Sequence, residues 1–513
     1  MKIFNSNPVL SCAEAKAWES RLLEDEAAEW AAMQKAGAAL ARGVQEDFRE
    51  IGGLPDDARL LVLVGKGNNG GDALLAARDL LVAKPQARAD VGFAFGEKSL
   101  RPLAQKSWQE LQQAAPGRVY QFERSKGMEH SYAVCLDGVF GFQFRPPLDE
   151  NTAGLLAWVN THPRIKLRAA VDLPSGLGEK NAGTVFRADF TYATGILKSP
   201  LLLPSNAPHI GRLRYLDLGF FNPVAGVGDP GPGSTSPATT DKILLTSILQ
   251  PLSRLRPAQT DKRAFGHLLV VGGSRSYPGA VLMTAQAALR SGVGLLTAFV
   301  PQSLAAEYAA RFPEAMWVGC PESTAGSLAG GTLALISEKL SRATAMVIGP
   351  GLGAEPEPLA MVRDVVTDLK IPILVDADAL RPEIVQTAGQ GRFIATPHAG
   401  EFQRISSSAK PSPSSVFVLK GSPTRIAAGG PVHHSLFGGP VLARGGSGDL
   451  LAGLIGGLLA QQPDDLLLAA CRGTVWHGLA ADLLARDQGQ VAVQTTQLLD
   501  FLQPALHLAD NET

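Results

Sequence analysis

Short apolar runs alternate with longer amphipathic stretches along most of the chain. Residues 14–50 are rich in Ala, Glu, Leu and Gln at helical spacing, and they predict one or two amphipathic helices. The apolar run 59–64 then predicts a buried strand, residues 65–72 a glycine-rich loop, and residues 73–83 a helix. This succession of strand, loop and helix is the building unit of layered α/β proteins.

The same alternation continues through the first half of the chain. The remaining runs of strand length are 89–95, 132–136, 167–171, 189–193 and 213–216. Amphipathic stretches come before most of them. The pattern predicts a doubly wound, mostly parallel sheet, whose ligand lies beyond the carboxyl ends of the strands.

The composition changes abruptly at residues 224–240, where Gly, Pro and Ser dominate. We interpret this segment as a linker between a first domain, 1–223, and a second domain, 241–513. The strands expected in the second domain are 267–271, 295–300, 345–348, 373–375, 393–395 and 416–419. We therefore predict two α/β domains. His433 and His434 are expected in a surface hairpin of the second.

Composition narrows the range of partners. The chain has 513 residues, too many for one core, and its 47 basic and 48 acidic residues give a net charge of −1. A chain with so little net charge has no positive electrostatic potential that would attract nucleic acid or an anionic membrane. We therefore expect neither as a partner. The four cysteines contain no Cys-x-x-Cys, which favours the reducing cytoplasm. The longest apolar run, 450–460, is too short to span a bilayer.

A glycine-rich turn runs directly into an apolar helix at residues 444–457. Unpaired backbone N–H groups and the positive end of the helix dipole would meet there, next to the carboxylate of Asp449. If a nucleotide phosphate bound those amides, Asp449 could take the proton of a hydroxyl that attacks phosphorus. The simpler interpretation is that Asp449 only caps the helix. We favour a site, because capping does not need the freedom of four nearby glycines: Gly445, Gly446, Gly448 and Gly453.

Oxygen-bearing side chains follow three predicted strands of the first half. The loop 65–72 reads Gly-Lys-Gly-Asn-Asn-Gly-Gly-Asp, Asp137 follows the strand 132–136, and Asp172 and Ser175 follow the strand 167–171. The ends of parallel strands face one crevice. Each residue alone could be a cap or a turn former. Together they predict a polar site with hard oxygen ligands, which suits an alkali or alkaline-earth cation as well as a polar substrate.

These motifs resemble, in the same order, those of the NAD(P)HX epimerase domain. That family has a Rossmann-like fold and interconverts the R and S forms of hydrated nicotinamide cofactors. The matching stretches are 65–72, 136–145 and 171–176. Lys198 also matches a lysine that is often seen in the family.

The resemblance implies roles for particular residues of the first half. A potassium ion would be held by Asn69, Asp137 and Ser175, and Asp172 would be catalytic. The residues implied in binding the hydrated cofactor are Asn68, Asn69, Gly70, Gly71, Asp72, Gly141, Phe142, Gln143, Phe144, Arg145 and Asp172.

The second half resembles the ribokinase-like superfamily and, within it, the ADP- or ATP-dependent NAD(P)HX dehydratases. Those enzymes use the phosphate of a nucleotide to turn the hydroxyl of the S hydrate into a leaving group, which restores NAD(P)H. The stretches that carry the resemblance are 267–274, 277–280, 349–353, 376–380, 396–401, 420–424 and 445–449.

The second resemblance also implies residue roles. Ala280, Gly351 and His398 would contact the hydrated cofactor, and Asp449 would contact its hydroxyl as a base. Mg²⁺ would bridge the phosphates of ADP or ATP. Arg444 departs from the family pattern, which has Thr or Ser there. The residues implied in nucleotide binding are Lys420, Gly421, Ser422, Pro423, Thr424, Gly445, Gly446, Ser447 and Gly448.

Two other readings remain open at this point. The second half could be a small-molecule kinase that stops at phosphoryl transfer, because Gly-Ser-Gly-Asp is shared across the superfamily. The first half could be a binding module without catalysis. We expect a bifunctional cofactor-repair enzyme of the cytoplasm that forms a homo-oligomer and has NAD(P)HX and ADP or ATP as its ligands. The sequence does not choose between ADP and ATP.

Overall fold

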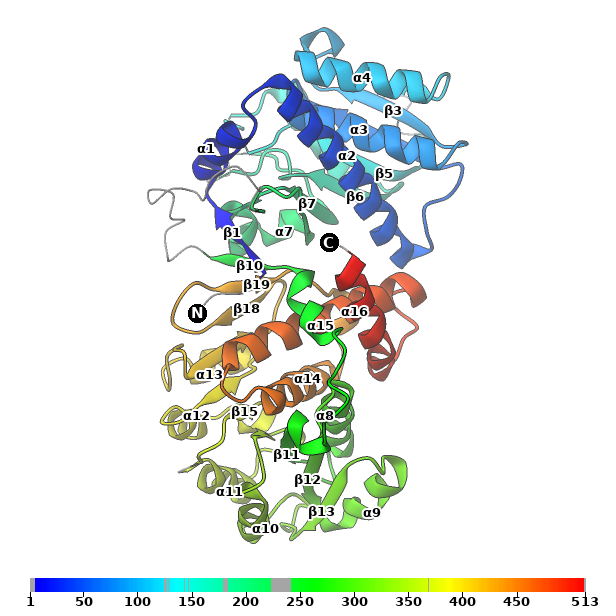
Figure 1. Ribbon diagram of the computed structural model, residues 1–513. Helices are drawn as coiled ribbons and strands as arrows, with labels where there is room; N and C mark the ends of the chain where they lie inside the picture. The colour runs from blue at the N-terminus through cyan, green and yellow to red at the C-terminus, as the bar shows by residue number, and fades with distance from the viewer. Residues whose placement is uncertain are drawn as a thin grey trace. The chain divides into compact units, whose positions relative to one another are not determined.

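The computed structural model describes residues 5–123, 127, 129–142, 144–145, 147–178, 183–222, 241–367 and 369–511. Within these limits the contacts form two compact units (Figure 1). The first unit spans 7–236 and 486–489, and the second spans 1–6, 237–485 and 490–513. The segment 224–240, predicted to be a linker, lies outside the described residues. The predicted α/β class is confirmed, with one sheet at the centre of each unit.

A parallel sheet forms the centre of the first unit. Among the described residues, its seven strands lie in the order β4 (Val119–Gln121), β3 (Arg88–Phe93), β2 (Arg59–Val64), β5 (Tyr132–Gly138), β6 (Ile165–Val171), β7 (Phe190–Thr194) and β9 (Arg212–Leu216). Every neighbouring pair is parallel. The chain moves outward from β2 and then returns to β5 on its other side. A ligand crevice is expected where the order reverses, beyond Val64 and Gly138.

Helices cover both faces of this sheet. Val62 and Leu136 pack with α2 (Glu26–Phe48), α3 (Asn68–Ala83) and α4 (Pro102–Ala114), whereas Leu61 and Leu63 pack with α6 (Glu150–Thr161). Successive side chains of a strand point to opposite faces, so each strand feeds both cores. The other regular elements of this unit are β1 (Ser6–Leu10), α1 (Cys12–Leu22), β8 (Leu197–Lys198) and α7 (Ala207–Ile210).

The second unit repeats the same strand order. Its strands lie in the order β13 (Met316–Cys320), β12 (Leu295–Pro301), β11 (His267–Val271), β14 (Ala345–Ile348), β15 (Ile373–Val375), β16 (Phe393–Ala395), β17 (Ser415–Leu419), β18 (Thr424–Ala427), β19 (His433–Ser435) and β10 (Lys242–Leu244). Strands β13 to β17 are parallel, and β18 runs antiparallel to both of its neighbours. The order reverses between β11 and β14, which places a second expected crevice there.

Two groups of helices sandwich the second sheet. The first group consists of α8 (Pro278–Arg290), α9 (Gln302–Arg311), α14 (Ser447–Gln461), α15 (Leu466–Gln488) and α16 (Leu502–Asn511). The second consists of α10 (Thr332–Leu340), α11 (Pro356–Val366), α12 (Pro382–Ala388) and α13 (Ala399–Ile405).

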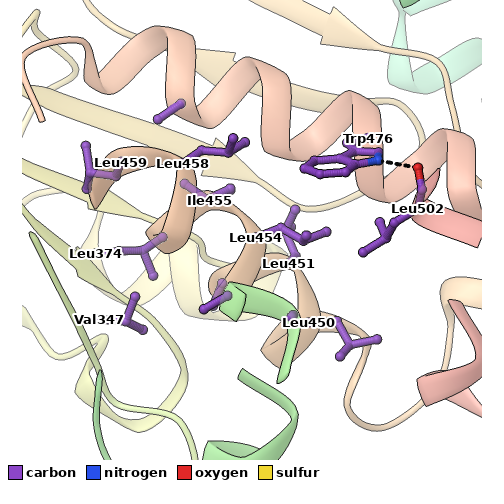
Figure 2. Packing of buried hydrophobic residues seen from close by; sticks show 14 of the residues in the cluster. Val347, Leu374, Leu450, Leu451, Leu454, Ile455, Leu458, Leu459, Trp476 and Leu502 are labelled. Carbon is purple, nitrogen blue, oxygen red and sulfur yellow. Dashed lines mark hydrogen bonds between the residues drawn. The ribbon is translucent and has the colours of Figure 1, made fainter. Parts of the chain in front are cut away.

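Helix α14 is buried at the centre of one core of the second unit. Figure 2 shows leucines of α14 packed with Val347 of β14 and Leu374 of β15. In the same view, the indole Nε1 of Trp476 donates a hydrogen bond to the carbonyl oxygen of Leu502 at 2.8 Å. This packing holds the start of α14 at the carboxyl edge of the sheet. In the part of the chain that the structure describes, no helix is long and apolar enough to cross a membrane.

All twelve predicted strands are confirmed, and five of them have the predicted bounds: β2, β11, β14, β15 and β16. Strands β1, β4, β8, β10, β13, β18 and β19 were not predicted, although β19 contains the two histidines of the expected hairpin. Those histidines are not on the surface. His433 and His434 are only 5% and 4% exposed, because β19 lies between β18 and β10.

Candidate functional site

A cavity of about 420 Å³ opens at the crevice of the first unit. Predicted ligand contacts from all three motifs line it, and so does Lys198. These residues are Asn68, Asn69, Asp72, Gly141, Phe142, Phe144, Arg145, Asp172 and Lys198. Gln143 lies outside the described residues. The structure therefore brings together in one cavity residues that are more than a hundred positions apart in the chain.

The run 68–72 forms the first turn of α3, so the prediction of a loop up to residue 72 was wrong. Its two glycines serve packing. A Cβ at Gly70 would lie 2.5 Å from the carbonyl oxygen of Gly65, and a Cβ at Gly71 would overlap the methyl group of Met33. Neither glycine lines the cavity described here. They let the helix start lie close to the end of β2, which presents Asp72 to the cavity wall.

A buried lysine is central to the polar part of the cavity. Lys198 is fully buried, and its ammonium donates a hydrogen bond to Asp172 Oδ1 at 2.5 Å and another to the carbonyl oxygen of Thr194 at 3.4 Å. The same ammonium lies 3.9 Å from Glu19 Oε1 and 5.0 Å from the ring centroid of Phe142. Burying an ammonium group costs free energy unless an opposite charge lies beside it. Lys198 therefore needs a carboxylate partner, and its hydrogen bond to Asp172 holds that carboxylate in place.

The carboxyl groups around this lysine outnumber it. Burial, together with the charges of Asp172 and Glu19, raises the pKa of Asp72 well above its ordinary value. Burial also raises the pKa of Glu19 to about 7, against the opposing charge of Lys198. Because Glu19 titrates near neutral pH, it can give and take a proton under physiological conditions, which is what acid–base catalysis needs. The sequence contained no signal for Glu19, which lies on α1, outside the three motifs.

The predicted potassium ligands lie in one hydrogen-bonded cluster. Asp137, fully buried, accepts hydrogen bonds from Ser175 N at 2.7 Å, Ser175 Oγ at 2.6 Å and Val139 N at 3.3 Å. Ser175 Oγ accepts from Phe140 N at 2.8 Å, and Asn69 Nδ2 donates to the carbonyl oxygen of Phe140 at 3.0 Å. These donors are neutral, and burial raises the pKa of Asp137 to about 6. A monovalent cation beside this carboxylate would compensate its charge, so the donor set fits K⁺.

The second unit holds a separate cluster at the start of α14. Gly446 precedes the helix with a φ of 87°, and Asp449 lies in the first turn. The ammonium of Lys420, just after β17, donates to Asp376 Oδ1 at 3.1 Å. It also lies 3.3 Å from where a Cβ on Gly448 would be. The predicted nucleotide lysine and the predicted base therefore lie on the same side of the sheet edge.

Asp449 is held in a strongly perturbed environment. The pKa of Asp449 is raised to about 7, chiefly by burial; the charges of Asp376 and Asp378 contribute to this rise, and the charge of Lys420 opposes it. Such a combination of burial and specific charged neighbours is typical of functional carboxyls. Sequence analysis assigned no separate role to Asp376 or Asp378.

The glycines near Asp449 have different roles, and our interpretation of them was partly wrong. A Cβ at Gly453 would overlap the carbonyl oxygen of Thr284 in α8, so this glycine allows two helices to pack closely. A Cβ at Gly446 would lie 2.5 Å from Met283 Sδ. A Cβ at Gly445 would meet nothing within 4 Å, which leaves that backbone open to a ligand.

Three more residues are predicted to contact hydrated cofactor in the second unit: Ala280, Gly351 and His398. Gly351, with a φ of 64°, approaches Ala280 so closely that an added Cβ would lie 2.9 Å from the Ala280 Cβ. His398 caps α13, because its Nδ1 accepts from the backbone N–H of Gly400 at 3.0 Å and of Glu401 at 3.3 Å. Its imidazole is 62% exposed, and ligand contact there stays a prediction.

Two further side chains lie next to the loop before α14: Arg444 and His477. The guanidinium of Arg444 donates to the carbonyl oxygens of Gln490 at 2.8 Å, Val491 at 2.7 Å and Val493 at 2.9 Å, which ties this loop to the segment after α15. His477 of α15 is buried, and burial lowers the pKa of its imidazole to about 4, against the opposing influence of the Ser447 backbone. Arg444 was visible as a departure from the family pattern, whereas nothing in one sequence distinguishes His477 from any core histidine.

Two family models match this chain. The model for the N-terminus of YjeF-related proteins matches residues 30–199, and the model for NAD(P)H-hydrate dehydratase matches residues 268–504. The first covers the cavity of the first unit from Met33 to Lys198, and the second covers the cluster around Asp449. The first match thus contains most of the cavity lining but not Glu19, which lies before residue 30, and the second contains the cluster around Asp449.

Curated proteins match over nearly the whole length. The bifunctional NAD(P)H-hydrate repair enzyme of Moorella thermoacetica is 31% identical over 512 residues, with 94% of this chain and 93% of that protein covered. The enzyme of the same description from Gloeobacter violaceus is 36% identical over 506 residues, with 93% of each covered. A crystal structure of the ADP/ATP-dependent NAD(P)H-hydrate dehydratase from Bacillus subtilis aligns with 52% of this chain and 97% of its own, at 24% identity and a TM-score of 0.42. By its full-length similarity to curated members, the chain belongs to the family of bifunctional NAD(P)H-hydrate repair enzymes.

Proposed function

We propose that this chain repairs hydrated nicotinamide cofactors in two steps. The first unit epimerises R- and S-NAD(P)HX, and the second dehydrates the S form to NAD(P)H at the expense of ADP or ATP. The observation that carries the proposal is that each unit has its own cluster of carboxyl groups around one lysine, Asp172 with Lys198 and Asp449 with Lys420, at the carboxyl edge of its own sheet. Family membership supports the substrate class.

In the second unit, Asp449 acts as the general base. It takes the proton of the hydrate's hydroxyl while that oxygen attacks the terminal phosphorus of the nucleotide. The amides of residues 445–448 and the segment Lys420–Thr424 hold the nucleotide. Once the hydroxyl is phosphorylated, the lone pair of the ring nitrogen expels phosphate and forms a C=N bond. Loss of a proton from the adjacent ring carbon then returns the electrons to nitrogen and forms the C=C bond of NAD(P)H, so the protein mainly has to position the reactants.

Two cations belong to this proposal. Mg²⁺ supplies charge neutralisation of the nucleotide phosphates when it is bound. Mg²⁺ usually keeps several waters and binds through substrate phosphates, so it needs few protein ligands. In the first unit, Asn69, Asp137 and Ser175 would hold K⁺ and keep the loop beside Phe140 in place.

The remaining expectations stay part of the proposal. We place the epimerase domain at 1–223, the linker at 224–240 and the dehydratase domain at 241–513. The near-neutral charge supports small-molecule ligands rather than nucleic acid or a membrane surface. We also propose a cytoplasmic homo-oligomer.

The dehydratase assignment is tested with S-NADHX, Mg²⁺ and either ADP or ATP. The readout is the near-ultraviolet absorbance of the restored dihydronicotinamide ring. Asp449→Asn should slow its appearance by roughly 10²–10⁴-fold, because the base is lost while nucleotide binding is kept. The matched control is Asp364→Asn on α11, whose side chain is 57% exposed. If Asp449→Asn forms NADH as fast as the control, the role of Asp449 is contradicted. If a phosphorylated hydrate accumulates and no NADH forms, the second unit is a kinase that stops at phosphoryl transfer.

A further inference from the structure

One carboxyl group of the cavity in the first unit, that of Glu19, lies outside the family motifs. Glu19 lies on α1 and lines the same cavity as Asp172. Its carboxylate and that of Asp172 both approach Lys198 Nζ, at 3.9 Å and 2.5 Å. The two carboxyl groups are therefore linked through one buried ammonium.

The position of Glu19 is fixed by the fold of the first unit. Strand β1 pairs with β8, with Leu10 opposite Lys198, and α1 follows directly. The indole of Trp18, the neighbour of Glu19, donates to the carbonyl oxygen of Phe220 at 3.2 Å. Ala15 of α1 is fully buried and packs with Leu10 and Ile196. These contacts hold Glu19 at the cavity wall, where its side chain is 23% exposed.

The charges that face Glu19 come from four elements. Lys198 on β8 favours its ionised form, whereas Asp172 after β6 and Glu29 on α2 disfavour it. Asp72 on α3, itself buried, belongs to the same group of interacting carboxyls. Burial is the largest influence and raises the pKa of Glu19 to about 7. Both protonation states of Glu19 are thus accessible in neutral solution.

The chemistry of epimerisation calls for an acid and a base. In the hydrate, the carbon that bears the hydroxyl is bonded to the ring nitrogen, so the nitrogen lone pair can form a C=N bond as the C–O bond breaks. A proton must reach the departing oxygen, which leaves as water. A second water then adds to the other face of that carbon, the C=N electrons return to nitrogen, and a base takes the surplus proton. One protonated and one ionised carboxyl supply this exchange with no net change in protons.

Resting on the proposed epimerase function of this cavity, we infer that Glu19 is a second catalytic residue, which donates the proton to the departing hydroxyl while Asp172, paired with Lys198, accepts the proton of the incoming water. Reaction in the opposite direction uses the two groups in exchanged roles. The inference explains why a cavity with one buried lysine is lined by more than one carboxyl.

The test measures interconversion of R- and S-NADHX by chromatography on the full-length protein, without nucleotide, so that dehydration does not occur. Glu19→Gln keeps the size of the side chain and removes the acid, and it should slow epimerisation by roughly 10²–10⁴-fold. The KM for the hydrate and nucleotide-dependent dehydration of the S form should be unchanged. The matched control is Glu24→Gln, an exposed carboxyl five positions further along that does not line the cavity.

A pH profile separates proton donation from a structural role. Glu19 donates only while protonated, so the wild-type kcat/KM should fall as the pH rises above about 7, and this fall should be absent from the residual activity of Glu19→Gln. Glu19→Asp retains the acid and should recover part of the rate. Glu19→Gln at the wild-type rate, with Asp172→Asn inactive, would overturn the inference and leave the epimerase function standing. A wild-type protein that does not accelerate interconversion would contradict both.

Discussion

At the scale of single residues, two carboxyl groups titrate near neutral pH for the same reason. Burial raises the pKa of Glu19 and of Asp449 to about 7. In each cluster one lysine opposes this shift, Lys198 in the first unit and Lys420 in the second, while neighbouring carboxylates reinforce it. The protonation state of each site is therefore set by burial and neighbouring carboxylates, which favour the neutral form, against one ammonium group, which favours the ionised form.

The pH dependence of dehydration follows from this balance. Asp449 acts as a base only when ionised, and its folded-state pKa of about 7 lies above the ordinary value, so the proton is still bound on the acid side. At saturating nucleotide, kcat/KM for the hydrate should rise with pH up to about 7 and then level off. Lys420→Met removes the charge that lowers this pKa, and should move the rise to higher pH.

The control for that experiment is Lys410→Met, because Lys410 is exposed and lies outside the cluster. The measurement is the initial rate of NADH formation across the pH range, with buffers matched in ionic strength. A profile without an acid-side rise would mean that Asp449 is not the base.

Single residues could be predicted where the chain places them at a strand or helix end. Asp172 and Asp449 directly follow a strand and a glycine turn, so the sequence pattern alone places them at a sheet edge. Glu19 and His477 could not be found this way, because both lie within helices, and nothing local distinguishes a cavity-facing helical side chain from an ordinary one. Only tertiary packing gives them their surroundings.

At the scale of elements, close helix packing places both sites. Helix α14 carries Asp449 and packs against α8 through Gly453, which has no side chain to separate the two backbones. Helix α3 similarly uses Gly70 and Gly71 to lie against the end of β2 and against α2. In both helices a polar first turn faces a crevice while glycines face the protein.

Replacing Gly453 tests this packing. Gly453→Ala places a methyl group on the carbonyl oxygen of Thr284, which cannot move without displacing α8, so the free energy of unfolding should fall by roughly 1–3 kcal/mol. Gly330→Ala is the control, since a Cβ there would meet nothing within 4 Å and the backbone is not left-handed. Denaturant unfolding measures both. Equal free energies of unfolding for the two variants would contradict this prediction, because they would show that α8 can shift without loss of stability.

Elements were predicted well where a strand is apolar and central, and poorly elsewhere. Central parallel strands are buried on both faces and read as continuous apolar runs, as in β2 and β11. The strands β4 and β18 were missed because they are short and contain exposed polar residues. The start of α3 was misplaced because glycines normally disfavour helix, and only its close packing explains them.

At the scale of the whole molecule, the two units share the same order of parallel strands but catalyse different reactions. In each unit the order reverses between the first strand and the fourth of the parallel set, and the site lies beyond that point. No internal repeat is visible in the sequence, so the shared order reflects a common solution to packing helices on both faces of a parallel sheet. Function differs because the loops at the strand ends differ.

The most direct test of the two-step account uses a mixture of R- and S-NADHX with Mg²⁺, K⁺ and ADP or ATP. Wild-type protein should convert the mixture to NADH beyond the initial S fraction, faster than spontaneous epimerisation allows. Asp172→Asn should stop at the S fraction and then follow the spontaneous rate, whereas Asp449→Asn should equilibrate the epimers without forming NADH. Wild-type conversion that slows at the S fraction in the same way as Asp172→Asn would contradict the account, because the first unit would then contribute no catalysis.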